Sequence, residues 1–160
     1  MVVTYDDSKI GKLVHRSTHH FEFKPGMMLL DEPVVDGNSH YNSAVYTALT
    51  EKVRIRLFLP EYGFSDEKFN EMGCRMVRTL EVVDWKGGPG ITGNEVDVKL
   101  DLYVERAYFH LYHEIMNLDG SLAAKAVGNQ IFLRKTKSGG FIPLLRVPEF
   151  FVDAIRNVKS

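Results

Sequence analysis

Cysteine is nearly absent from this chain, and its scarcity excludes several kinds of chemistry. The 160 residues contain one cysteine, Cys74, so we expect no disulfide within the chain and no cysteine cluster to hold zinc. A single cysteine in this setting is typical of a reduced thiol. We expect Cys74 to be buried and not to act in catalysis.

Long apolar runs and an excess of one charge are also missing. No uninterrupted apolar stretch approaches the roughly 18 residues that a membrane helix requires, and the first residues do not resemble a secretory signal. The 20 basic and 21 acidic residues give a formal charge of -1, which creates no net field toward nucleic acid or anionic lipid. We therefore expect a cytoplasmic protein with no membrane insertion and no nucleic-acid partner.

Size and composition favour one globular domain. A chain of 160 residues with 44% hydrophobic residues is long enough to bury a real core. The sequence has no internal repeat and no low-complexity segment. We expect a single domain spanning residues 1–160.

The strongest periodic pattern predicts a helix over residues 43–58, ended by Pro60. Its apolar residues recur every four positions, at Val45, Leu49, Val53 and Leu57. A weaker pattern predicts a helical turn over 65–71, and residues 148–158 could form a short terminal helix.

The remaining segments have the alternating or β-branched character of strands. We expect a hairpin-like opening strand over 19–35 and further strands over 76–85, 95–104, 108–116 and 122–134. The predicted fold class is α+β, with one long helix followed by an antiparallel meander that wraps its apolar face around the helix.

Four polar side chains set two residues apart precede the long helix: Asp36, Asn38, His40 and Asn42. Such residues often form turns or cap helices, and that interpretation stays open here. The alternative is a site. The first N–H groups of a helix lack internal partners and carry the positive end of its dipole, so they could polarise a carbonyl while a carboxylate activates water.

The polar run and the order of elements resemble hot-dog fold acyl thioesterases. In plant acyl-carrier-protein thioesterases, and more loosely in single-domain acyl-CoA thioesterases, a strand leads through an Asp-x-Asn-x-His-x-Asn segment into a central helix. The matching positions here are Asp36, Asn38, His40 and Asn42, then Tyr46 at the aromatic position and Glu51 near the acidic one.

Two later segments extend the resemblance to roughly residues 18–146. Pro89-x-x-x-Gly93-Asn94-x-Val96 is similar to the turn into the third strand, and Asp119-Gly120-x-Leu122-Ala123 is similar to a later hairpin. The resemblance implies a single hot-dog domain in which an antiparallel sheet wraps a long central helix.

The implied activity is hydrolysis of acyl-CoA or acyl-carrier-protein thioesters, with no metal and no cofactor. The implied catalytic residues are Asp36, Asn38, His40, Asn42 and Glu51. Asp36 or Glu51 would activate water or attack directly. His40 and Asn42 would orient water or the carbonyl, and Asn38 would hold a carboxylate.

We expect three further residues to contact substrate. Ser43 lies at the helix start, Tyr46 would mostly pack, and Arg54 is a candidate for phosphate contact at a pocket mouth. The sequence departs from the family pattern at Ser43, where many relatives repeat asparagine, and at an inserted segment over 59–72. Glu51 is displaced by one place from its position in the plant enzymes.

Two other functions remain open. A hydratase-type hot-dog enzyme would add water to an enoyl thioester, but its Asp-x-Asn-Pro-x-His signature lacks the proline here and His40 comes one residue early. A non-catalytic acyl-binding module is the other. Exposed sheet edges give a reason to expect a homodimer or a dimer of dimers.

His110-x-x-His113 is a poor candidate for a metal pair. Both residues fall on a predicted strand, where side chains three positions apart point to opposite faces. We therefore expect no shared ion between them.

Overall fold

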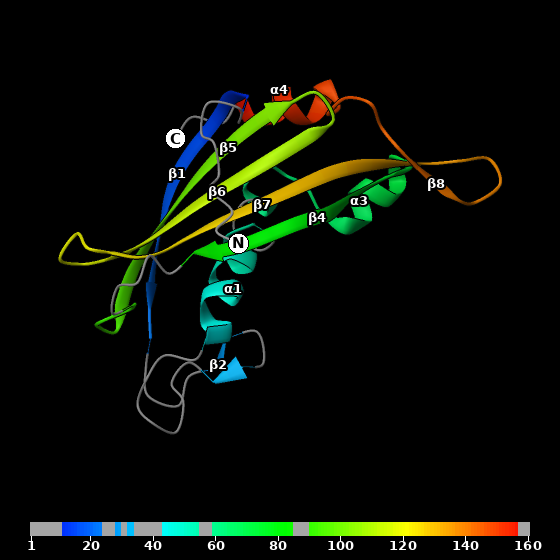
Figure 1. The fold of residues 1–160 in the computed structure, drawn as a ribbon. Coiled ribbons are helices and arrows are strands. Elements are labelled where there is room, and N and C mark those ends of the chain that lie inside the picture. The colour runs from blue at the N-terminus through cyan, green and yellow to red at the C-terminus, as the bar shows by residue number, and fades with distance from the viewer. Residues whose placement is uncertain are drawn as a thin grey trace.

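The computed structural model describes residues 11–23, 28–29, 32–33, 43–54, 59–84 and 90–156. Long antiparallel strands dominate it (Figure 1). They are β1 (Lys12–Glu22), β4 (Cys74–Asp84), β5 (Glu95–Glu105), β6 (Tyr108–Asn117) and β7 (Leu122–Lys135), in the spatial order β1-β5-β6-β7-β4. A short β8 (Phe141–Pro143) pairs with β7, and β2 (Met28–Leu29) pairs with β3 (Glu32–Pro33).

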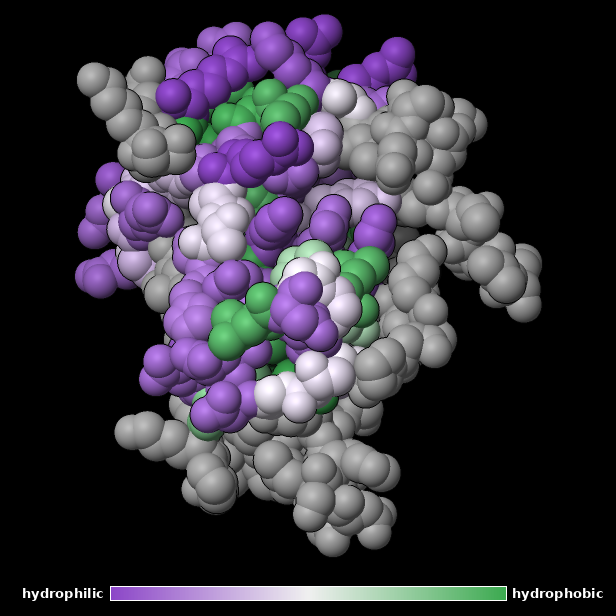
Figure 2. Space-filling model, turned by 90° about the vertical axis from the view of Figure 1, so that its left-hand side faces the viewer, coloured by the Kyte–Doolittle hydropathy of each residue, from purple (hydrophilic) through white to green (hydrophobic). Residues whose placement is uncertain are grey.

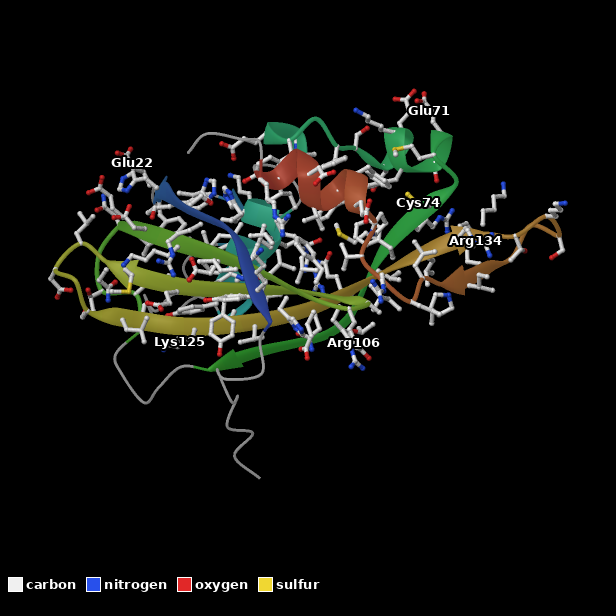
Figure 3. All side chains as sticks on the ribbon, turned by 90° about the horizontal axis from the view of Figure 1, so that it is seen from above. Glu22, Glu71, Cys74, Arg106, Lys125 and Arg134 are labelled. Carbon is white, nitrogen blue, oxygen red and sulfur yellow. The ribbon has the colours of Figure 1, made fainter. Side chains whose placement is uncertain are left out.

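The described helices lie on one side of the large sheet, as the view from above shows (Figure 3). They are α1 (Ser43–Glu51), α2 (Leu59–Glu61), α3 (Asp66–Glu71) and α4 (Glu149–Arg156). Residues 52–54 continue α1 as a π-helical turn. None of the described helices is long and apolar enough to cross a membrane.

The core forms where α1 meets the sheet. The four-residue spacing of Val45, Leu49 and Val53 brings them to one side of the helix, and each has 0% exposure. The predicted alternation of β5 is confirmed, since Val96, Val98, Leu100 and Leu102 are all fully buried. These residues belong to one continuous apolar cluster.

A group of phenylalanine rings fills one end of this core. Phe151 of α4 packs against Phe64, Phe109 and Phe132, with ring centroids 5.1, 4.9 and 4.9 Å away. Phe69 of α3 joins through Phe64 and Phe132. The inserted segment and the C-terminal helix therefore close this end with aromatic side chains.

The outer side of the sheet edge is polar. Figure 2 shows the side of the molecule that lies on the left in Figure 1, where β1 is the edge strand, and hydrophilic side chains cover most of its described surface. Arg16 on β1 and Asp101 on β5 form a two-pronged ion pair there, at 2.7 and 2.9 Å. One face of β1 thus meets solvent while the other meets the core.

The predicted order of strands was wrong in one respect. The second half is not a simple meander, because β4 lies at the far edge beside β7 and not next to β5. Hydrophobic alternation identifies a strand but carries no information about which strand it pairs with. The meander is confirmed only for β5, β6 and β7.

Element boundaries also differ from expectation at the first strand. β1 starts at Lys12, before the predicted start at residue 19, because its outer face is polar and a bulge between Leu13 and His15 interrupts the alternation. The predicted helix start at Ser43 is confirmed, while residues 55–58 lie outside the described part. The short elements α2 and β8 were not predicted.

Replacing Phe151 by alanine should remove the centre of the aromatic group. We expect Phe151→Ala to lower the free energy of unfolding by about 3–5 kcal/mol, because the side chain is fully buried. Urea denaturation, monitored by circular dichroism, measures this change in the free energy of unfolding. The neighbouring Phe150, at 37% exposure, is the matched control and should cost about 1 kcal/mol or less. Equal losses in the two variants would contradict the described packing.

Candidate active site

The predicted polar run leads directly into α1. Asp36, Asn38, His40 and Asn42 lie outside the described residues, so their roles stay predictions. The helix itself begins at Ser43 and has no acidic side chain in its first turn. No carboxylate of the same turn therefore offsets the positive end of the helix dipole.

Tyr46 fixes the start of α1 against the loop that precedes β5. Its side chain is buried, and its hydroxyl accepts a hydrogen bond of 2.9 Å from the backbone N–H of Ile91. Gly90 has a φ of 76°, and a Cβ at this position would collide with the Tyr46 hydroxyl. The chain therefore needs a glycine beside this tyrosine.

Asn117, at the end of β6, holds the same loop from the other side. Its amide donates to Gly90 O and to Ser121 Oγ, each at 3.0 Å, and its oxygen accepts from Thr92 N at 3.0 Å. Sequence reasoning missed this residue. The available signal was a polar residue at an inward position of an alternating strand, directly before the Asp119-Gly120 turn.

Glu51 and Arg54 lie farther along the helix. Glu51 is half-buried at the last position of α1, roughly 12 Å along the axis from Ser43 given the helical rise. Arg54 is buried at 4% exposure. The Gln130 amide, turned so that its oxygen faces the guanidinium, accepts from Arg54 Nε at 3.1 Å and Nη1 at 3.3 Å. This buried position differs from the pocket mouth at which we expected Arg54.

Polar side chains also line the inward face of β1. Tyr62, in the inserted segment, has its hydroxyl 2.6 Å from His15 Nε2, and the two rings meet edge to face. Ser17 Oγ lies 2.9 Å from His19 Nε2. Burial lowers the pKa of both histidines, partly offset by the carboxylate of Glu61. Burial likewise raises the pKa of Tyr62.

His113 is the most deeply buried ionisable group described in the core. It is 3% exposed, and neither ring nitrogen has a hydrogen-bond partner among the described residues. Burial, with smaller contributions from His19 and Arg78, lowers the pKa of His113 to about 3. The ring is therefore neutral at any ordinary working pH.

The two histidines of β6 lie on opposite faces, as predicted. His110 Nδ1 lies 2.7 Å from Asn129 Oδ1, whereas His113 shares the inward face with Leu111 and Ile115. Elsewhere in the described part, His20, Glu22 and Glu95 come close enough to hold an ion. The His20 nitrogens already face Asp97 and Glu95, at 2.8 and 3.2 Å.

Cys74 is buried, as expected from the sequence. Its side chain is buried at the start of β4, and burial raises the pKa of the thiol. Figure 3 shows it on the ribbon close to the junction with α3. A protonated, buried thiol is a poor nucleophile, so Cys74 is a packing residue.

Solved structures share this fold. Slr0204, a 1,4-dihydroxy-2-naphthoyl-CoA thioesterase from Synechocystis, aligns with a TM-score of 0.69 and 15% identity, over 90% of this chain and 98% of that one. SAV2348 from Staphylococcus aureus, in complex with CoA, aligns at 0.63 and 18% identity, over 94% and 85%. An acyl-ACP thioesterase from Bacteroides thetaiotaomicron aligns at 0.63 and 15% identity, over 82% of this chain and 49% of that one.

These likenesses establish the architecture. No protein-family model and no curated protein matches the sequence. The strand order and the helix-covered sheet, together with the structural matches, show that the described residues have the hot-dog fold. This confirms the fold class predicted from the sequence.

Removing the Tyr46 hydroxyl should loosen the loop before β5. Tyr46→Phe leaves the buried Ile91 N–H without its acceptor, so we expect a loss of about 1–3 kcal/mol in the free energy of unfolding. Chemical denaturation measures the free energy of unfolding, and amide hydrogen exchange at Ile91 measures how much the loop is loosened. Tyr108→Phe, at a 47% exposed position, should leave both values unchanged. Protection of Ile91 that survives Tyr46→Phe would contradict this role.

The buried histidine should make stability depend on pH. Its pKa falls from 6.5 in the unfolded chain to about 3 in the fold, so its contribution is present above pH 6.5 and is lost as the pH falls toward 3. In His113→Phe, unfolding titrations between pH 7 and 4 should show a slope smaller by up to about 1.4 kcal/mol per pH unit.

His20 provides the contrast for this measurement. Asp97 and Glu95 raise its pKa, so its contribution is present below pH 6.5 and is lost as the pH rises. His20→Phe should therefore change the slope in the opposite direction. Identical pH profiles for wild type and His113→Phe would show that His113 does not titrate as described.

Proposed function

We propose that this chain is an acyl thioesterase, which hydrolyses acyl-CoA or acyl-carrier-protein thioesters to the free acid and the thiol. The observation that carries the proposal is the start of α1 at Ser43, directly after the Asp36–Asn42 run, within a hot-dog fold. Structures with this architecture include proteins described as acyl-CoA and acyl-ACP thioesterases. The sequence pattern suggests this chemistry, and the fold of the described residues is compatible with it.

The reaction needs a nucleophile and a place for negative charge. Asp36 takes a proton from water as the water oxygen attacks the thioester carbon, and the first N–H groups of α1 stabilise the resulting oxyanion. Collapse of this intermediate breaks the C–S bond, and the thiolate leaves and takes up a proton. His40 and Asn42 orient the water or the carbonyl, and Asn38 holds the carboxylate.

The predicted residues within and after α1 have other proposed roles. Tyr46 positions the helix start through its bond to Ile91, and Ser43 offers its backbone at the same end. Glu51 remains the second candidate carboxylate, although it lies more than two helical turns from the helix start. Arg54 stays a proposed substrate contact, and the Gln130 amide would hold its guanidinium in the interior of the fold.

We propose that the working form is a homodimer or a dimer of dimers in the cytoplasm. Among the described strands, β1 and β4 are the edges of the path β1-β5-β6-β7-β4, and each has an unpaired side. Such edges favour pairing with a second copy. Light scattering at micromolar concentration tests this, and a monomer would count against it.

Thiol release from a panel of short, long, branched and aromatic acyl-CoAs tests the activity. We expect Asp36→Asn to reduce kcat by about 100-fold or more while the fold is retained, because the general base is lost. Glu51→Gln decides whether the second carboxylate shares this work. Glu67→Gln, on the exposed surface of α3, is the matched control and should leave kcat unchanged.

Each outcome separates the candidate functions. Release that depends on Asp36 supports the thioesterase. If wild type and variants are all inert toward every thioester, hydrolysis is wrong, and addition of water to an enoyl thioester becomes the next assay. Failure of that assay as well would leave a non-catalytic acyl-binding module.

A further inference from the structure

We propose that His113 determines specificity by hydrogen-bonding to a hydroxyl or carbonyl group carried on the acyl part of the substrate. This proposal rests on the proposed function, but binding of the acyl group does not require turnover. The proposal concerns the inward face of the sheet at its centre. It makes an oxygen-substituted acyl group, and not a plain aliphatic one, the preferred ligand.

The position of His113 is central. It lies in the middle of β6, with Leu100 of β5 and Ala126 of β7 as its direct cross-strand neighbours. Leu111 and Ile115, two residues away on either side, share its face and belong to the core cluster. The imidazole is therefore surrounded by apolar groups on the strand positions next to it.

The unpaired nitrogens are what require an explanation. Most buried polar side-chain atoms in folded proteins have a hydrogen-bond partner, in the protein or in ordered water. Both nitrogens of His113 lack one among the described residues, at 3% exposure. A phenylalanine or leucine would fill such a position without that cost, so the histidine is best explained by a partner that arrives with a ligand.

The neighbouring strand presents small side chains next to His113. Ala124, Ala126 and Gly128 occupy successive inward positions on β7, opposite Ile115, His113 and Leu111 of β6. Farther along the same face, the ring of Phe132 is packed by Phe69 and Phe151. His113 therefore has small side chains beside it on β7, and bulky rings lie farther along the same face.

The chemistry of the imidazole defines the ligand. A neutral ring offers one N–H donor and one acceptor nitrogen, so a hydroxyl can use either nitrogen and a carbonyl can use the donor. Ser17 and His19 add polar atoms to the same face, since Ser17 pairs with Leu100 across from His113. An unsubstituted acyl chain would leave the two His113 nitrogens unpaired, and sites of this kind discriminate strongly against ligands that lack the matching group.

Matched pairs of thioesters test the preference with the full chain. Octanoyl-CoA is compared with monohydroxylated octanoyl-CoAs, and benzoyl-CoA with monohydroxylated benzoyl-CoAs. For wild type we expect the best hydroxylated probe to exceed its parent by at least about tenfold in kcat/KM. His113→Phe should bring this ratio close to one, and His113→Gln, which keeps a donor and an acceptor, should restore part of it.

His20→Phe is the matched control, because it makes the same substitution on the outer face of β1. It should leave the ratio unchanged. A merely structural role of His113 would lower activity toward both members of a pair equally. That result, or a wild-type preference for the unsubstituted acyl group, would overturn the proposal.

A second measurement separates this proposal from the hydrolysis itself. The ring nitrogen signals of His113 are followed by ¹⁵N NMR while the free hydroxy acid or its unsubstituted parent is added. A shift with the hydroxy acid alone supports the proposal even if no thioester is hydrolysed. Hydrolysis without preference and without a shift rejects the role of His113 and leaves the proposed thioesterase activity standing. The absence of both the shift and the hydrolysis rejects both proposals.

Discussion

Burial of one side of α1 against the sheet is the constraint on which the rest of the fold depends. Val45, Leu49 and Val53 have no exposed surface, and burying each such side chain contributes about 1.5–3 kcal/mol. Because these residues fix how the helix is rotated, the Tyr46 hydroxyl falls where Ile91 N–H can donate to it. The helix start, the loop before β5 and the end of β6 are thereby held as one unit, and the candidate site lies at the helix start.

The sequence predicted those parts of the fold that depend on local periodicity. The start of α1 at Ser43 and the buried face of β5 follow from repeats of about four and two residues. Strand order does not, because β4 reaches β7 through pairings such as Cys74 with Arg134, sixty residues apart. The hot-dog architecture was nevertheless predicted, through the resemblance in the order of elements and in the polar run before α1.

The candidate site was predicted only in part, because sequence patterns show neighbours along the chain but not contacts between strands. Spacing in the chain singled out Asp36, and strand alternation put His110 and His113 on opposite faces. Alternation could not show that His113 lacks hydrogen-bond partners in the described part of the chain, since this depends on Leu100 and Ala126 from other strands. Nor could it show that Gln130 would meet Arg54 in the interior.

The aromatic contacts of α4 bear on how the chain folds during synthesis. Phe151 completes the packing of Phe109 and Phe132, yet the ribosome makes α4 after every strand of the large sheet. Until then the nascent chain carries β6 and β7 with these rings uncovered, and such surfaces are prone to aggregation. α4 also contacts β1, the first described strand, so the last described helix joins segments far apart in the sequence. Because contacts of such long sequence separation slow folding, we expect the docking of α4 to be a late and slow step.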